Sequence, residues 1–164
     1  VARHPHKAPP GFERVVGRDL LDVVLSEADY VVIATPLTDE TRSMIGAAQL
    51  ARLKSTAVVI NIGRGAVIDE SALMDALQGG RIGGAGLDVT WREPLEPNHP
   101  LWAMDNVLLS PHMSSDAIGW QEAMVERFVD NLDRWLRRQS LISVVDKELG
   151  YVPSEVDTLS GANR

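Results

Sequence analysis

Short apolar runs alternate with helix-like patterns over most of the chain. Near-continuous apolarity over five or six residues is typical of strands covered on both faces of a parallel sheet. The pattern predicts four such strands, at residues 30–35, 57–62, 84–89 and 106–110. Because helical patterns separate these runs, their order indicates βαβ units, a mostly parallel sheet with flanking helices and an α/β fold class.

Two helices are predicted from apolar spacing and end signals. Asp69 is the expected N-cap of the first, and Gly79 begins the glycine pair that ends it. A longer helix is predicted after Ser114, because its apolar residues recur at spacings of three and four, and we expect it to pack as core. The inward stripes are Leu73, Ala76 and Leu77 in the first helix, and Met124, Val125, Phe128, Val129, Leu132, Trp135 and Leu136 in the second.

Composition narrows the class of protein. With 164 residues and 45% hydrophobic content, the chain is long enough for one compact domain with a real core. Its net charge of −7 disfavours a nucleic-acid partner. The absence of cysteine excludes disulfides and thiolate zinc sites, and no metal site is predicted. No run approaches the roughly 18 apolar residues of a membrane span, and no secretory leader opens the chain, so we expect a soluble, cytoplasmic protein with no membrane partner.

Candidate functional residues follow the predicted strands. In an open parallel sheet, ligands bind beyond the carboxyl ends of the strands. An arginine can bind a carboxylate through two hydrogen bonds, a histidine titrates near neutral pH, and a glutamate can stabilise the protonated histidine. Together these residue types favour one rim that binds and transforms an anionic ligand. The residues are Thr35 after the first strand, Arg64 between Gly63 and Gly65 after the second, Asp88 and Glu93 after the third, and His112 after the fourth.

Each of these residues also has a plainer interpretation when it is taken alone. Arg64 could be a solvated arginine, and its two flanking glycines could serve a turn that needs positive φ. Asp88 could cap a following turn, and His112 could be an ordinary surface or core histidine. The functional interpretation rests on their occurrence together.

Four linked motifs carry a family resemblance. The order "TPLTDETR", "NIGRG", "GAGLDVTWREP" and "LLSPH" resembles the nucleotide-binding half of the D-isomer-specific 2-hydroxyacid dehydrogenases, over residues 29–135. The resemblance implies a Rossmann-like domain. It assigns residues 1–138 to the C-terminal part of an NAD(P)-binding domain, and residues 139–164 to a segment returning toward a substrate domain, with a frayed polar tail.

The resemblance also implies a reaction and roles for residues. A hydride would pass between nicotinamide C4 and C2 of a small D-2-hydroxy acid or 2-keto acid. Arg64 would orient the substrate, His112 would donate or accept the proton, and Glu93 would stabilise the protonated His112. A glutamate at position 93 also argues against the formate-oxidising relatives, in which a glutamine partners the histidine. The implied dinucleotide-binding residues are Thr35, Pro36, Ile62, Gly63, Arg64, Asp88, His112 and Ser115.

The largest departure from the family is the missing dinucleotide fingerprint. The pattern G-x-G-x-x-G does not occur in the chain, and "GGRIGGAG" precedes a strand, whereas a phosphate loop follows one. We therefore expect an incomplete Rossmann-like sheet that lacks its first strands and most of the substrate domain. An alternative hypothesis is a non-catalytic remnant, or a dinucleotide-binding or assembly module of the same family.

The first residues bear on cofactor choice. Relatives that prefer NAD carry an acidic residue after the second strand, to bind the adenosine ribose. Here Arg3 occurs with no acid nearby in the sequence, which favours the 2′-phosphate of NADP. The alternative is a solvated basic loop formed with His4, His6 and Lys7. The resemblance further implies a homodimer.

Overall fold

The chain forms two compact units in the computed structural model, which describes residues 1–3 and 7–153. The first unit is Val1–Pro111 and the second is His112–Arg164. The predicted boundary after residue 138 falls inside the second unit, and the domain assignment stays a prediction. The polar tail at 154–164, predicted to fray, lies outside the described residues.

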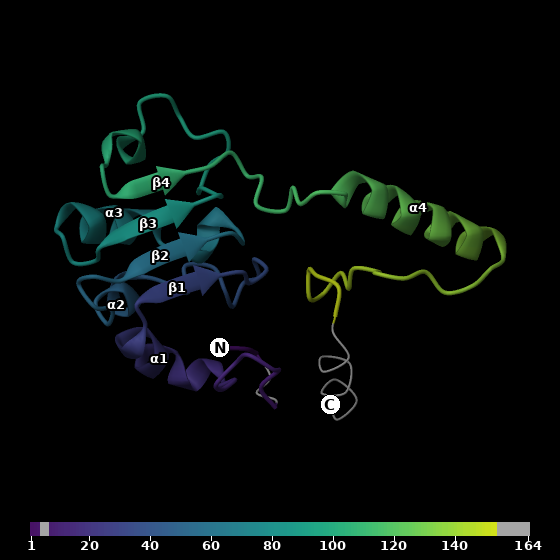
Figure 1. Cartoon of the computed structure of the whole chain (residues 1–164), viewed down its shortest axis with the longest axis horizontal. Helices are drawn as coiled ribbons and strands as arrows, with labels where there is room; N and C mark the ends of the chain where they lie inside the picture. Colours follow the sequence, from purple (N-terminus) through teal and green to yellow (C-terminus); the bar gives the residue numbers. More distant parts are fainter. Residues whose placement is uncertain (4–6, 154–164) are drawn as a thin grey trace. The chain divides into compact units, whose positions relative to one another are not determined.

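A parallel sheet forms the centre of the first unit, which confirms the α/β, Rossmann-like class. Its order is β1-β2-β3-β4, and the four arrows of Figure 1 point the same way. Each predicted strand is present but ends earlier than its apolar run. The strands are β1 (Tyr30–Ile33), β2 (Val58–Asn61), β3 (Gly84–Leu87) and β4 (Val107–Leu109).

Helices connect successive strands, as parallel pairing requires. The predicted cap is confirmed, since Asp69 Oδ1 accepts a hydrogen bond from the N–H of Ala72 at 3.0 Å, and Gly79 follows the last turn of that helix. The helical segments of this unit are η1 (Arg18–Leu20), α1 (Leu21–Glu27), α2 (Ala47–Leu50), η2 (Gly65–Val67), α3 (Glu70–Gln78) and η3 (Pro100–Ala103).

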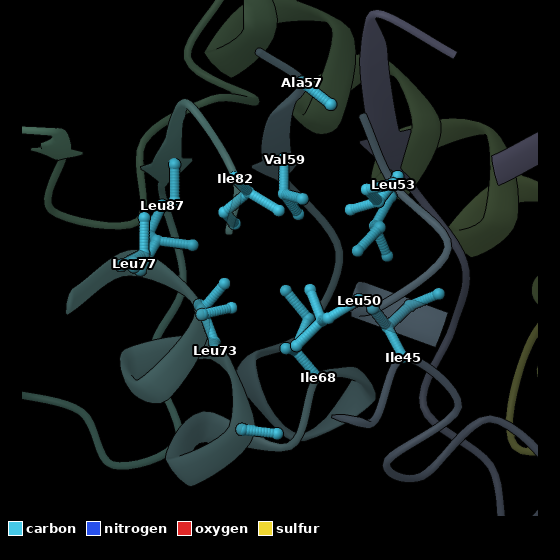
Figure 2. Packing of buried hydrophobic residues seen from close by; sticks show 14 of the residues in the cluster. Ile45, Leu50, Leu53, Ala57, Val59, Ile68, Leu73, Leu77, Ile82 and Leu87 are labelled. Atoms are coloured by element: carbon cyan, nitrogen blue, oxygen red, sulfur yellow. The ribbon is translucent and has the colours of Figure 1, made fainter. Parts of the chain in front are cut away.

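The hydrophobic core lies between one face of the sheet and the helices α2 and α3 (Figure 2). Val59, at the centre of β2, is completely buried, and the predicted stripe of α3 faces inward. Alternation along the strands sends Asn61 and Leu87 to this same buried face. The core therefore fixes which side chains stand behind the carboxyl edge of the sheet.

The opposite face of the sheet is open in this unit. Tyr30, Val32 and Leu108 are 70%, 59% and 75% exposed. The prediction that both faces are covered is therefore wrong for the unit as described. Apolar residues on both faces of a strand show that burial of both faces is favourable. They do not show which segment packs against the second face.

The second unit contains α4 (Trp120–Leu136) and a segment that runs back beside it (Figure 1). Asn131 joins the two, because its Oδ1 accepts from the N–H of Ile142 at 2.9 Å and its Nδ2 donates to the Ile142 oxygen at 3.0 Å. The predicted helix is confirmed, but the prediction that it packs as core is wrong, since no residue of α4 is buried and Phe128 is 67% exposed. Within residues 1–3 and 7–153, no helix is long and apolar enough to cross a bilayer.

We predict that Leu73→Ala lowers the free energy of unfolding by about 2–5 kcal/mol, because it leaves a cavity behind a fully enclosed side chain of α3. Urea denaturation followed by circular dichroism measures the change. Leu108→Ala is the control, since this exposed leucine should cost less than about 0.5 kcal/mol. Equal losses in the two variants would contradict the packing described here.

Candidate functional site

The carboxyl ends of the strands form one edge, where the backbone pairing continues one residue past the strands. This extension brings the first residues of the following loops into line, so the loops leave the sheet side by side. The bonds run from the N–H of Ile62 to the oxygen of Ile33, from Asp88 to Asn61 and from Ser110 to Leu87, each at 3.0 Å.

The turn after β2 presents Arg64 and is braced from below by Asn61. Asn61 is 1% exposed. Its Oδ1 accepts from the N–H of Gly63 and its Nδ2 donates to the backbone oxygen of Arg64, both at 3.0 Å. The Arg64 side chain is exposed, and its Nη1 donates to the Gly63 oxygen at 2.7 Å. A buried amide therefore sets the backbone from which the guanidinium projects.

The two glycines beside Arg64 permit close approach between loops. Neither has positive φ, so the alternative that they serve a left-handed turn is wrong. A Cβ on Gly63 would lie 2.8 Å from the backbone oxygen of Thr35, and a Cβ on Gly65 would lie 2.0 Å from the carbonyl group of Thr90. The Arg64 turn is thus wedged between the loops that follow β1 and β3.

Thr35 supplies a polar atom without a partner. Its Oγ1 is buried and makes no hydrogen bond. The next residue, Pro36, is held in place by a hydrogen bond from the Thr41 hydroxyl to its backbone oxygen, at 2.7 Å. A buried hydroxyl at a sheet edge costs free energy unless a ligand or water satisfies it. The unsatisfied Thr35 hydroxyl therefore fits a polar group of a bound dinucleotide.

The loop after β3 begins with a buried acid. Asp88 is 6% exposed, and its Oδ1 accepts a hydrogen bond from the Ser110 hydroxyl at the end of β4. This contact ties the ends of β3 and β4 together. Ile62, on the neighbouring loop, is 41% exposed and offers an apolar surface at the same edge.

Glu93 lies farther along the same loop, with its carboxylate folded onto the backbone. Its Oε1 accepts from the N–H of Thr90 at 3.2 Å, and the Thr90 hydroxyl donates to the oxygen of Arg92 at 2.7 Å. Because Gly65 contacts Thr90, the Glu93 loop and the Arg64 turn share one interface.

Arg3 has an acidic neighbour in space that the sequence does not reveal. Its Nη2 lies 3.3 Å from Oε2 of Glu40, on the loop after β1. This ion pair corrects the expectation of an arginine without an acid nearby. His4 and His6 lie outside the described residues.

His112 and Ser115 belong to the second unit. His112 is its first residue, directly after Pro111, and has φ of 56°, which is uncommon for a residue with a Cβ. Ser115 lies in the turn that leads toward α4, where its oxygen accepts from the N–H of Ala117 at 2.8 Å. The structure thus brings Thr35, Arg64 and Glu93 together in one unit and places His112 at the start of the next.

Comparison with known proteins decides the family. Residues 2–114 match the D-isomer specific 2-hydroxyacid dehydrogenase NAD binding domain, which is more than half of the chain. The chain belongs to this family. The predicted resemblance is confirmed, and the match covers every described strand.

Relatives include several enzymes that act on small 2-keto acids. The chain is 48% identical over 132 residues to glyoxylate/hydroxypyruvate reductase B of Escherichia fergusonii, covering 80% of this chain and 40% of that protein. Among solved structures, a D-isomer specific 2-hydroxyacid dehydrogenase from Xanthobacter autotrophicus Py2, in complex with NADPH and MES, gives a TM-score of 0.75 at 42% identity, over 82% of this chain and 43% of that one. An NADPH-dependent glyoxylate/hydroxypyruvate reductase from Sinorhizobium meliloti, in complex with NADP and sulfate, gives 0.77 at 34% identity, over 89% and 48%. The chain thus spans less than half the length of each.

Sequence reasoning missed several residues that shape this member of the dehydrogenase family. The role of Asn61 could have been predicted from the sequence, because a lone amide in an apolar strand is usually buried and hydrogen-bonded. The contacts of Thr90 with Gly65, and of Glu40 with Arg3, join positions far apart in sequence, and no local pattern indicates them.

We predict that Gly65→Ala lowers the free energy of unfolding by about 1–3 kcal/mol, because its Cβ would overlap the Thr90 carbonyl. Gly86→Ala is the matched control, since the nearest atom, on Ile60, lies 3.8 Å from its added Cβ. Urea denaturation of both variants measures the difference. A Gly65→Ala protein as stable as Gly86→Ala would contradict the close approach of the two loops.

Proposed function

We propose that the protein is an NAD(P)-dependent oxidoreductase that reduces small 2-keto acids to D-2-hydroxy acids, and that this chain supplies the nucleotide-binding rim. The observation that carries the proposal is the braced turn at Arg64, which presents an exposed guanidinium at the carboxyl edge of the sheet, the edge at which the Thr35 hydroxyl is buried and unpartnered. Glyoxylate and hydroxypyruvate are the substrates to test first, because similar proteins are named as reductases of these two acids.

Arg64 is proposed to bind the substrate carboxylate. A guanidinium matches a carboxylate through two parallel hydrogen bonds, which fixes the direction of the neighbouring carbonyl. The bond from Arg64 Nη1 to the Gly63 oxygen holds the side chain over its own turn, and its other N–H groups are oriented by that bond. The turn thereby limits the conformational freedom that Arg64 loses on binding.

His112 is proposed to handle the proton. In reduction, one ring nitrogen donates a proton to the oxygen on C2 while a hydride reaches C2, so the carbonyl becomes a hydroxyl. In oxidation, the same nitrogen accepts that proton. Glu93 is proposed to stabilise the protonated form of His112 by its negative charge.

The dinucleotide is proposed to lie along the carboxyl edge of the sheet. The nicotinamide cofactor would supply the hydride. Its polar groups would be held by Thr35, Asp88 and Ser115, with Pro36, Ile62 and Gly63 forming the surface beneath, and Arg64 and His112 would border the nicotinamide. The buried, unpartnered Thr35 hydroxyl supports this placement.

NADP is the proposed preference, through Arg3. Its pairing with Glu40 leaves the arginine 33% exposed, and an exchange of partner from carboxylate to 2′-phosphate would keep its charge compensated. Two structurally similar proteins are described in complex with NADPH or NADP, which supports the preference. A homodimer and a cytoplasmic location remain predictions.

We predict that His112→Ala lowers kcat for glyoxylate reduction by about 10²- to 10⁴-fold, because the proton donor is lost, while NADPH binding changes little. Steady-state kinetics measure the effect. The assay uses the full-length protein from its natural source, whose length is first established by intact mass. Lys147→Ala, an exposed change in the same unit, is the control. Full turnover by His112→Ala would refute the assigned proton donor. Absence of any NAD(P)H binding by the wild type would favour the non-catalytic alternative.

We predict that Arg3→Ala raises the Kd for NADPH by about 10- to 100-fold and leaves the Kd for NADH nearly unchanged, because one charge-assisted contact to the 2′-phosphate is lost. Fluorescence titration with each nucleotide measures the ratio. Lys7→Ala, an exposed cation nearby in the sequence, tests whether general positive charge suffices. Parallel weakening of NADPH and NADH would contradict a role at the 2′-phosphate.

A further inference from the structure

Glu70, the first residue of α3, contacts two positions of the connection between β3 and β4. Its Oε2 accepts from the backbone N–H of Trp91 at 3.3 Å, and its Oε1 lies 3.4 Å from Nε2 of His99. The side chains of Glu70 and His99 are only 24% and 17% exposed, so solvent screens this pair less than it screens a surface ion pair.

Both ring nitrogens of His99 contact other residues. Its Nδ1 accepts from the N–H of Leu101 at 3.3 Å and so caps η3. A ring nitrogen that accepts carries no proton, so neutral His99 carries its proton on Nε2, the atom that faces Glu70. Nε2 lies within ion-pairing distance of the Glu70 carboxylate, so His99 links the start of η3 to the start of α3.

The segment between Trp91 and His99 contains Glu93. Near the His99 end, the oxygen of Glu96 accepts from the His99 N–H at 3.0 Å and from Trp102 Nε1 at 2.9 Å. Glu93 itself is exposed. Both ends of a segment that is exposed except at Leu95 and His99 thus contact one carboxylate on a helix of the core.

The Glu70 carboxylate also stands close to the Arg64 turn. Glu70 and Trp91 line the same small hollow as Asn61 and Gly65. Movement of the backbone at residue 91 would therefore alter the packing of Gly65 on Thr90 as well as the position of Glu93.

We propose that Glu70 and His99 form a positioning pair that holds the segment 91–99 in place, and with it the carboxylate of Glu93. Neither residue touches the reacting atoms. The proposal rests on the proposed function, because the consequence for catalysis depends on the role proposed for Glu93 in stabilising protonated His112. The anchoring itself is a property of the fold and is measurable without substrate.

The test is hydrogen–deuterium exchange, read by mass spectrometry on peptides that cover residues 90–99. We expect Glu70→Ala to speed exchange there by about tenfold, since loss of one hydrogen bond is worth about that factor. Glu70→Gln keeps one acceptor oxygen and should restore part of the protection. His99→Asn can still cap η3 but cannot reach Glu70, so it should reproduce the effect from the other end even if a Glu70 variant folds poorly.

Glu96→Gln is the matched control. It removes a carboxylate from the same segment, where Glu96 forms an exposed pair with Arg92 at 3.3 Å, and it should leave exchange at residues 90–99 unchanged. Unchanged exchange in both Glu70→Ala and His99→Asn, or an equal change in Glu96→Gln, would overturn the proposal.

Kinetics separate this proposal from the proposed function. In the active enzyme, Glu70→Ala should lower kcat by about tenfold and change KM for glyoxylate by less than about twofold, because a misplaced Glu93 affects proton transfer more than binding. Faster exchange with unchanged kcat would overturn the positioning role. If the wild type reduces no 2-keto acid, the proposed function fails, and exchange alone still decides whether Glu70 and His99 anchor the segment.

Discussion

The in-register parallel pairing of β1 to β4 is the constraint on which the rest of the first unit depends. Pairing Ile33 with Asn61, and Asn61 with Leu87, aligns the strand ends. A slip of one residue in β2 would exchange its two faces, since side chains alternate along a strand. Asn61 would then leave the buried face, and the brace beneath Arg64 would be lost. The register thus determines both the core and the exit direction of the loop that carries the guanidinium.

Close backbone contact turns these separate loops into one surface. Two glycines allow the Arg64 turn to lie against Thr35 on one side and Thr90 on the other, at distances that no side chain would permit. The Arg64 turn has little freedom to rearrange, because backbone atoms of both neighbouring loops pack directly against it. Such rigidity suits a site whose charged groups must be held in position before the ligand arrives.

Local patterns predicted what depends on local physics. Apolar runs marked every strand of the sheet, and Asp69 marked the start of α3, because strand burial and helix capping involve residues close in sequence. Partners distant in sequence were not predicted. The amphipathic period of α4 shows which side of the helix favours burial, but it does not show which segment covers that side. The open sheet face at Val32 is likewise apolar, and its pattern does not identify a covering segment. Candidate residues at the strand ends were proposed from their chemical types and their order along the chain. The residues that hold these loops in place gave no signal in the sequence, apart from the lone amide of Asn61.

The use of a carboxylate to anchor the Glu93 segment has an electrostatic reason. Glu70 lies in the first turn of α3, where unpaired N–H groups and the helix dipole favour negative charge. An arginine in place of His99 would carry a permanent positive charge and would compete with Arg64 for anionic ligands, whereas the imidazole reaches the Glu70 carboxylate without a permanent charge. The arrangement keeps the positive charge of the edge at Arg64, where an anionic substrate is proposed to bind.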